Sequence, residues 1–304
     1  MSEDITFDRS FDAPSGRVVD VSPLVRRIVA PNPSPFTFTG TCTYIIGRGS
    51  VAILDPGPDD PAHIAAVLDA VRGEEVSHVF ITHTHRDHSP ACPAVVAATG
   101  AVTVAEGPHR PSRPIEVGEG ARLDASADMD FRPDIAIADG ATLAGAGWTL
   151  TAIATPGHTA NHTAFALKEE DLLFSGDHVM AWATSIVAPP DGSMGDYIAS
   201  LERLAARTEK VYLPGHGGPV RDAPAHVRDF LDHRRAREAA ILRALDRDAT
   251  TIPDLVRGIY IGLDPRLVGA ASLTVLAHLE HLVAGGRVAT DGPPSINGRF
   301  RIAA

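Results

Sequence analysis

Residues 82–88, with the sequence Thr-His-Thr-His-Arg-Asp-His, place three imidazoles and one carboxylate almost side by side. They follow an apolar Val-Phe-Ile stretch, which is typical of a buried strand that leads into a loop. Alternation along a strand would put His83 and His85 on the same side, whereas Asp87 and His88 lie past the strand end and can turn toward a second point. Imidazoles and carboxylates bind metal ions, so this spacing predicts two adjacent metal positions.

The simpler interpretation is that these histidines are ordinary surface or core residues, as a single histidine usually is. Three histidines within six positions, next to an aspartate and after an apolar run, make that interpretation weaker. A histidine-rich low-complexity tract is excluded because the flanking sequence is mixed.

Three later strand-like stretches also end at a residue type that metal sites use. They run into Pro-Gly-His158, Ser-Gly-Asp177 and Pro-Gly-His216, and an earlier stretch runs into Asp55. A glycine beside each of the three later residues lets the backbone turn sharply and approach its neighbours closely. We therefore expect several strand ends to deliver these side chains to one place.

The elements that must position these residues can be read from hydrophobic periodicity and turn chemistry. We expect one or two strands within 17–30, further strands at 43–46, 51–54, 79–81, 101–105, 147–155, 163–167, 172–174 and 210–213, and helices at 61–71 and 197–206. Residues 107–139 are rich in Pro, Asp and Gly and are expected to be mostly loop.

Composition indicates a globular chain. The 304 residues are 44% hydrophobic and 21% charged, and this length favours about two domains. No uninterrupted apolar run approaches the roughly 18 residues of a membrane span, and the N-terminus lacks a secretory signal, so we expect a cytoplasmic protein. Cys42 and Cys92 are expected to be buried free thiols rather than a disulfide or a metal site.

The C-terminal part differs in kind from the rest, which predicts domains at 1–222 and 223–304. Residues 1–222 carry 16 Lys and Arg against 29 Asp and Glu, whereas residues 223–304 carry 11 against 9. An apolar stripe over 227–245, a short helix at 252–259, a third helix over 273–283 and a terminal hairpin over 288–302 together describe a winged helix.

The His-x-His-x-Asp-His run, followed in order by Gly-His158, Gly-Asp177 and Gly-His216 and preceded by Asp55, resembles the metallo-β-lactamase superfamily. The resemblance implies an α+β fold, namely an αββα sandwich, here followed by the small winged-helix domain. It also implies a ligand set in which Asp177 bridges two metal ions, the first bound by His83, His85 and His158 and the second by Asp87, His88 and His216.

This ligand set is that of the binuclear hydrolase branch of the superfamily. β-Lactamases of the commonest subclass use a cysteine where Asp177 stands, so antibiotic hydrolysis is not the expected activity. We expect a metal-bridging hydroxide to attack an ester, thioester or lactone-type small molecule, with Asp87 and Asp177 as the catalytic carboxylates. Zinc is the first choice of metal, and manganese or iron is also compatible. Asp55 is expected to hold the 83–88 loop, and His178 to support the ligands or face the substrate.

Loops 31–42 and 179–195 are expected to form the pocket walls, with Met180, Trp182 and Tyr197 as candidates. The sequence does not identify the substrate or the oligomeric state.

The C-terminal part together with the His-Arg-Arg sequence at 233–235 resembles the β-lactamase-like protein 2 group within the superfamily. This resemblance keeps single-strand-specific endoribonuclease activity open, with RNA as a partner. Arg287, Arg299 and Arg301 could then contact nucleic acid, although a domain that packs on the active site is the favoured interpretation. A nucleic-acid-binding regulator with a vestigial metal site and an iron-dependent sulfur dioxygenase are further alternatives.

Overall fold

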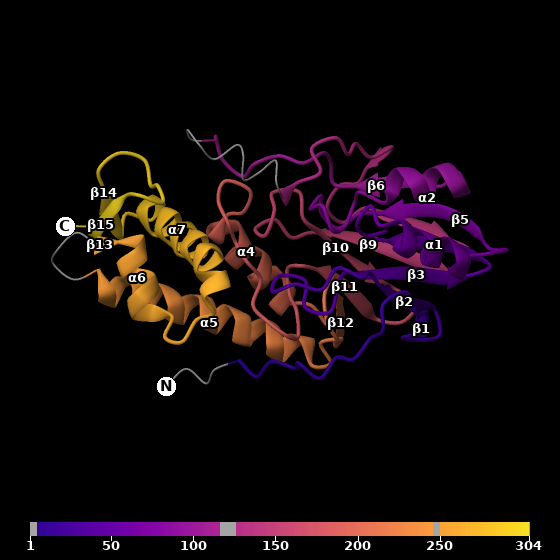
Figure 1. The fold of residues 1–304 in the computed structure, drawn as a ribbon, viewed down its shortest axis with the longest axis horizontal. Coiled ribbons are helices and arrows are strands. Elements are labelled where there is room, and N and C mark those ends of the chain that lie inside the picture. The colour runs from indigo at the N-terminus through magenta and orange to yellow at the C-terminus, as the bar shows by residue number, and fades with distance from the viewer. Residues whose placement is uncertain (1–4, 116–125, 246–249, 304) are drawn as a thin grey trace.

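Two β-sheets packed face to face form the first part of the protein (Figure 1). The computed structural model of the chain describes residues 5–115, 126–245 and 250–303. The first sheet has the strand order β1 (Val19–Asp20), β2 (Val25–Val29), β3 (Cys42–Arg48), β4 (Ser50–Leu54), β5 (Glu75–Phe80), β6 (Val102–Ala105) and β7 (Ile135–Ala136). The second has the order β12 (Val211–Pro214), β11 (Leu172–Gly176), β10 (Thr163–Leu167), β9 (Trp148–Ala154) and β8 (Thr142–Gly145).

Aromatic side chains fill the space between the two sheets. The ring of Phe80 on β5 lies 5.2 Å from that of Phe165 on β10 and 6.0 Å from that of Trp148 on β9. All three side chains are buried, and each such burial stabilises the fold by about 1.5–3 kcal/mol. The interlocked rings fix the two sheets relative to each other, and with them the ends of their strands.

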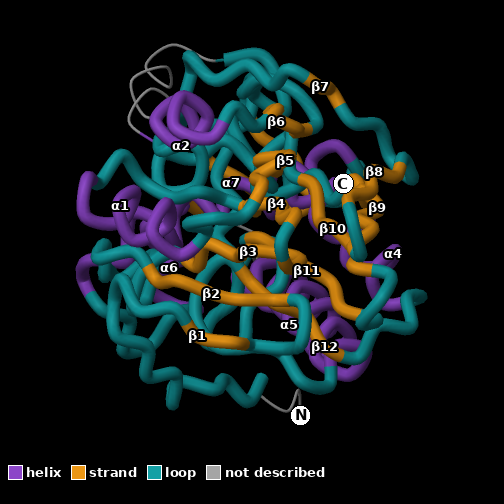
Figure 2. Tube along the Cα trace, turned by 90° about the vertical axis from the view of Figure 1, so that its right-hand side faces the viewer, coloured by secondary structure: helices purple, strands orange, loops and turns teal. Residues whose placement is uncertain are grey.

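Helices cover the outer face of each sheet, so the first part is an αββα sandwich, as predicted. Helices α1 (Pro61–Ala70) and α2 (Cys92–Thr99) contribute Val67 and Val95 to the core behind the first sheet. Helices α4 (Met194–Ala205) and α5 (Ala223–Ala244) pack behind the second sheet. Figure 2 shows α1 and α2 on one side of the strands and α4 on the opposite side.

The C-terminal part has the predicted winged-helix order. After α5 come β13 (Thr250–Thr251), α6 (Ile252–Ile259), the 3-10 turn η1 (Pro265–Leu267), α7 (Val268–Ala284) and the hairpin of β14 (Val288–Thr290) and β15 (Arg299–Ile302). The strands form a small sheet in the order β13-β15-β14. Thr251 caps α6 by accepting a hydrogen bond from the backbone N–H of Asp254, an interaction worth about 1 kcal/mol.

Pro265–Ala284 is a continuous helical stretch whose length and composition would suit a membrane span. Polar residues such as Arg266 and Ser272 interrupt its apolar sequence, so it contains no uninterrupted apolar run of that length. Val275, Leu276 and Leu279 of this stretch are buried in the winged-helix core. Packing inside the domain therefore accounts for its apolar side.

Helix α5 is shared by the two parts of the protein. Val227 and Phe230 near its start pack in the core behind the second sheet, whereas Ile241 near its end packs in the winged-helix core. The predicted boundary between residues 222 and 223 falls at the first residue of this helix and stays a prediction.

The expected elements are found with shifts of a few residues at their ends, and β13 is an additional short strand. Two further strands of the first part were also not expected: β7 lies within the 107–139 segment that was expected to be loop, and β8 was not predicted. Both are edge strands with mixed burial, so their hydrophobic pattern is weak. Residues 116–125 of the expected loop lie outside the described residues.

Candidate metal centre

The predicted metal-binding residues meet where strands of the two sheets end. His83, His85, Asp87 and His88 follow β5, and His158, Asp177 and His216 follow β9, β11 and β12. Close approach of the strand ends depends on glycine at two positions. At Gly157 the φ angle is +140°, and a Cβ atom there would lie 2.5 Å from the backbone nitrogen of Tyr197. At Gly215 a Cβ atom would lie 2.5 Å from Oδ1 of Asp177, so no larger residue fits without displacing that carboxylate.

Three histidines form the first group of candidate ligands. Nδ1 of His85 lies 3.0 Å from Nε2 of His83 and 3.1 Å from Nε2 of His158. Nitrogens bound to one tetrahedral zinc ion at their usual bond length would lie about 3.3–3.4 Å apart. The three nitrogens therefore need to separate by only a few tenths of an ångström to hold one ion.

Asp87, His88 and His216 form the second group. Oδ2 of Asp87 lies 3.4 Å from Nε2 of His88 and 3.2 Å from Nε2 of His216. Ligand-type atoms within each group lie within 4.8 Å of one another, and the same holds for a third group of His83, His88 and Asp177.

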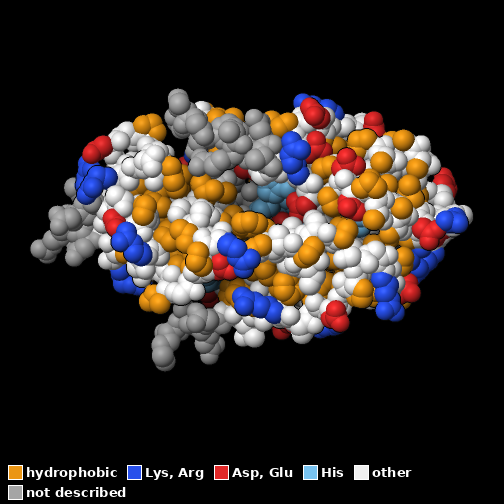
Figure 3. All heavy atoms as spheres, in the orientation of Figure 1, with side chains coloured by type: hydrophobic (Ala, Val, Ile, Leu, Met, Phe, Trp, Pro, Cys, Tyr) orange, Lys and Arg blue, Asp and Glu red, His pale blue; other side chains and the backbone are white. Residues whose placement is uncertain are grey.

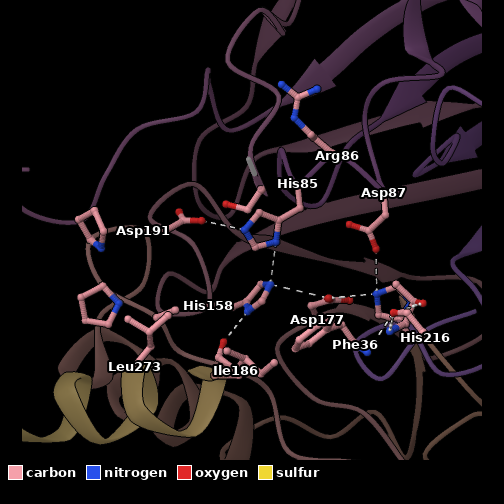
Figure 4. A pocket seen from close by; sticks show the side chains of 17 residues that line it. Phe36, His85, Arg86, Asp87, His158, Asp177, Ile186, Asp191, His216 and Leu273 are labelled. Carbon is pink, nitrogen blue, oxygen red and sulfur yellow. Dashed lines mark hydrogen bonds and ion pairs between the residues drawn. The ribbon is translucent and has the colours of Figure 1, made fainter. Parts of the chain in front are cut away.

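Asp177 lies between the two groups (Figure 4). Its Oδ2 is 3.7 Å from Nε2 of His158 and 3.2 Å from Nε2 of His216. Its Oδ1 and Nε2 of His88 are buried atoms for which the described residues supply no hydrogen-bond partner. Buried polar atoms rarely lack a partner, so this gap fits a cation between them.

Hydrogen bonds behind the imidazoles set which nitrogen faces the centre. Nδ1 of His88 lies 2.9 Å from Oδ2 of Asp55, and Nδ1 of His158 lies 2.6 Å from the carbonyl oxygen of Ile186. In His85 the supporting contact is at the other nitrogen, because Nε2 lies 2.7 Å from Oδ2 of Asp191. Such contacts fix the ring orientation and tautomer of metal-binding histidines.

Asp55 supports the 83–88 loop and belongs to none of the three ligand groups. Its Oδ1 accepts from the backbone N–H of Thr82 at 2.8 Å, and its Oδ2 accepts from the hydroxyl of Thr82 at 2.7 Å. With its contact to His88, this one carboxylate fixes both the start and the end of the motif. Asp55 itself has a φ of 49°, a left-handed conformation that costs free energy in a non-glycine residue.

Burial and nearby carboxylates act in opposite directions on the imidazoles of the cluster. Burial lowers the pKa of His83 well below its ordinary value and that of His158 to about 4, which leaves neutral imidazoles ready to coordinate. At His216 burial acts in the same direction, but the carboxylates of Asp177 and Asp87 outweigh it and raise the pKa to about 9. Burial would raise the pKa of Asp177, yet His216 and His88 hold it well below its usual range. Divalent cations displace protons from such a carboxylate–imidazole cluster.

A cavity of about 640 Å³ opens above these residues. Its floor includes His85, Asp87, His158, Asp177 and His216. Its walls are mainly apolar and include Phe36, Ile186, Ala188, Pro189, Pro190, Ala270 and Leu273. Figure 3 shows histidine side chains at the bottom of a hollow on this face.

Helix α7 of the winged-helix domain forms part of this cavity wall. Ala270 and Leu273 come from that helix, and Leu273 points toward the cavity in Figure 4. An ion pair of 2.7 Å between Arg113 and Glu280 also ties the helix to the first part of the protein. The winged-helix domain therefore packs on the candidate site, the interpretation that the charge balance favoured.

Of the two positions expected for His178, beside the ligands or facing the substrate, the structure shows a buried side chain away from the cavity. His178 is fully buried and lies outside the cavity lining, with its ring centroid 4.3 Å from that of Tyr197. Met180 and Tyr197 are likewise buried in the core and do not line the cavity, because the chain turns inward after Asp177. Trp182 lines a neighbouring cavity instead.

Sequence reasoning missed Asp191 and His109, which lie behind His85. Oδ1 of Asp191 lies 3.4 Å from Nε2 of His109, and Nδ1 of His109 lies 2.9 Å from the hydroxyl of Thr84. Neither residue has a motif around it that could have revealed this contact. His162 also lies behind the centre, and its Nε2 accepts from the backbone N–H of Asp177 at 3.2 Å.

Comparisons with known proteins agree with this geometry. Residues 36–216 match the model of the metallo-β-lactamase superfamily, and residues 251–294 match that of the β-lactamase-associated winged-helix domain. The lactamase-like protein adaB of Aspergillus niger is 30% identical over 298 residues, covering 91% of this chain and 86% of that protein. The atrochrysone carboxyl ACP thioesterase AgnL7 of Paecilomyces divaricatus is 32% identical over 238 residues, covering 76% of this chain and 67% of the relative.

A crystal structure of a metallo-β-lactamase family protein from Thermus thermophilus is similar over both parts of the chain. It has a TM-score of 0.73 and 26% sequence identity, and it covers 93% of this chain and 100% of that one. With the His and Asp cluster at the ends of the sandwich strands, these matches show that the chain belongs to the metallo-β-lactamase superfamily and carries its associated winged-helix domain.

Proposed function

We propose that the protein is a binuclear metal-dependent hydrolase that cleaves thioesters or related esters and lactones of small molecules. The position of Asp177 carries this proposal, because its carboxylate lies within 3.7 Å of nitrogens from both ligand groups. A single carboxylate shared by two groups is the arrangement expected of a two-metal site.

His83, His85 and His158 would hold one metal ion, Asp87, His88 and His216 the other, and Asp177 would bind both. Two divalent ions there would supply an activated water nucleophile and would stabilise negative charge on the attacked carbonyl oxygen. The donor set of imidazoles and carboxylates suits zinc and is also compatible with manganese or iron.

Asp87 is the carboxylate of the cluster that faces the cavity most openly, with 26% of its side chain exposed. Its Oδ2 accepts a hydrogen bond from the hydroxyl of Thr41 at 3.2 Å, which fixes the carboxylate plane. Asp87 is thus placed to orient the attacking water and to accept its proton. Asp177, which is more deeply buried, positions the two groups relative to each other.

The cavity walls support an acyl compound as the substrate. Phe36, Ile186 and Leu273 offer apolar surface directly above the polar floor, which suits an acyl chain whose carbonyl lies at the bottom. The thioesterase among the relatives acts on an acyl group carried by an acyl carrier protein, as its name states. This agrees with thioesters as the first substrate class.

RNA is a less well supported substrate. Arg287 and Arg301, two of the candidate nucleic-acid contacts, pair with Glu238 at 3.4 Å and Asp291 at 3.1 Å. A chain with a net charge of −11 and an apolar active-site wall offers little to a phosphate backbone. The same observations count against a nucleic-acid-binding regulator.

The test is an activity comparison on purified protein whose metal content has been measured. Thioesters and lactones are compared with a labelled single-stranded RNA, and Asp177→Ala serves as the inactive control. Turnover of the acyl compounds that is lost in the variant supports the proposal, whereas cleavage of RNA alone contradicts it. Measurement of the bound metal separates zinc or manganese from iron and so tests the dioxygenase alternative.

A further inference from the structure

A second cavity of about 250 Å³ lies beside the active-site cavity. The two cavities share Phe36, Ile186 and Ala270 in their walls, so they are neighbours on either side of these three residues. The second cavity lies between the winged-helix domain and residues 182–186 of the first part.

The polar lining of this cavity is basic. Arg234 and Arg237 come from successive turns of α5, His233 lies beside them, and Arg9 comes from the N-terminal segment. Among the described residues, no Asp or Glu lines the cavity. The cavity is therefore positively charged within a chain whose net charge is −11.

Two of these guanidinium groups lack a carboxylate partner in the described structure. Arg234 is only 2% exposed, and its Nη2 donates to the carbonyl oxygen of Ser185. Nη2 of Arg237 lies 3.5 Å from Nε2 of His233, a distance at the limit of a hydrogen bond. The Nε atoms of both arginines are buried without an acceptor from the described residues.

Aromatic rings hold both groups in place. The guanidinium carbon of Arg234 lies 4.8 Å from the ring centre of Tyr197, and that of Arg237 lies 4.1 Å from the ring centre of Tyr260. Glu238 is close in sequence, but its carboxylate pairs with Arg287 at 3.4 Å and lies 3.6 Å from Nε2 of His281. Glu238 thus forms an ion pair with neither Arg234 nor Arg237.

Burial of a cation without a counter-charge destabilises the folded protein. A neutral side chain in the same place would avoid this loss of stability if the role were structural alone. The loss is recovered if an anion enters the cavity, since guanidinium groups bind phosphate and carboxylate oxygens in a bidentate manner. We propose that this second cavity is a substrate subsite for an oxyanion, a phosphate or carboxylate at the end of a substrate whose scissile bond lies in the metal-lined cavity.

This inference rests on the proposed thioester hydrolysis, and matched pairs of substrates test it. One pair is butyryl-4′-phosphopantetheine and butyryl-pantetheine, which differ only in the phosphate. The other is succinyl-pantetheine and butyryl-pantetheine, which differ in a terminal carboxylate. The pair whose charged member has the lower KM identifies the anion.

In Arg237→Gln, the KM of the charged member should rise about 10-fold or more, while the KM of the neutral member and both kcat values change little. Arg235→Gln is the matched control, because Arg235 lies on the same helix but is exposed and pairs with Glu202 at 3.2 Å. Arg237→Lys keeps the positive charge but loses the planar guanidinium group that can donate two parallel hydrogen bonds. The KM of the charged member should therefore rise less than in Arg237→Gln. Equal KM values within both pairs in the wild-type protein, or equal changes for charged and neutral members, overturn the proposal.

Calorimetry on uncleavable analogues separates this inference from the proposed function. S-methyl-4′-phosphopantetheine is compared with S-methyl-pantetheine, and S-(3-carboxypropyl)-pantetheine with S-butyl-pantetheine. Tighter binding of a charged analogue that disappears in Arg237→Gln supports the subsite even if no thioester is hydrolysed. If neither charged analogue binds more tightly than its neutral partner, the subsite is refuted even in an active thioesterase.

Discussion

Oδ2 of Asp191 lies 2.7 Å from Nε2 of His85, although the two residues are 106 positions apart in the sequence. This contact leaves Nδ1 of His85 facing His83 and His158. A loop from the second half of the sandwich therefore selects the nitrogen that a motif in the first half presents to the centre.

Replacing Asp191 should weaken metal binding without unfolding the protein. Loss of such a supporting contact typically costs 10–100-fold in metal affinity, so we expect a decrease of about that size for Asp191→Ala and a smaller one for Asp191→Asn. Competition with a chromogenic chelator measures the affinity. An unchanged affinity in Asp191→Ala would show that the orientation of His85 is set without this carboxylate.

Removing the carboxylate between the two groups should reduce metal content and hydrolysis together. In Asp177→Ala we expect at least one of the two ions to be lost and kcat to fall by about 1,000-fold or more, because the remaining ligands can hold at most one ion tightly. Metal analysis and thioester turnover are measured on the same sample. Asp232→Ala, which removes an exposed carboxylate on α5, is the control and should retain both properties. Full activity in a metal-free Asp177→Ala would contradict the proposed mechanism.

Chelation should lower thermal stability. The ions bind the folded protein only, so at 100 times the dissociation constant each adds about 2.7 kcal/mol to the free energy of unfolding. Dialysis against a chelator should lower the midpoint of thermal unfolding, and adding back zinc or manganese should restore it. A midpoint that does not respond to metal would show that the cluster is a structural polar network.

Truncating the wall that the winged-helix domain provides should weaken binding of acyl chains. Leu273→Ala removes apolar contact worth about 1–2 kcal/mol, so the KM for a medium-chain thioester should rise about 5–30-fold while that of an acetyl thioester stays nearly constant. Val268→Ala, on the same helix but outside this cavity, is the matched control. A KM that rises equally for both chain lengths would mean that Leu273 acts through the fold.

Acid should destabilise the winged-helix part through His278. Burial lowers the pKa of His278 to about 4, Glu238 acts against that shift, and Arg234 adds to it. Because the unfolded chain takes up the proton near pH 6.5 and the folded chain only near pH 4, the free energy of unfolding decreases as the pH falls through this window, by up to about 1.4 kcal/mol per unit. Denaturant titrations of wild type and His278→Leu test this, and the variant should show a smaller slope. His281→Leu, on the exposed side of the same helix, should retain the wild-type slope.

The cluster of candidate ligands could be predicted from the sequence because its signal is local. Each residue of the cluster follows an apolar strand and a glycine or belongs to one short motif, and the order of these landmarks matches the family. Asp191 could not be predicted, since only the path of a distant loop brings it to His85. The two alternatives for His178 could not be separated from the sequence, because adjacency to Asp177 does not fix the direction of the side chain where the chain reverses at a strand end. The wall formed by Leu273 depends on how two domains pack, which the apolar pattern of one helix does not encode.

Helix α7 places Ala270 and Leu273 above the candidate metal centre, far along the chain from every ligand. Part of the cavity wall is therefore encoded apart from the candidate ligands, while Phe36 and Ile186 of the first part supply the facing wall. Substitutions on this face of α7 can change the shape of the cavity while the loops that carry the candidate ligands keep their sequence.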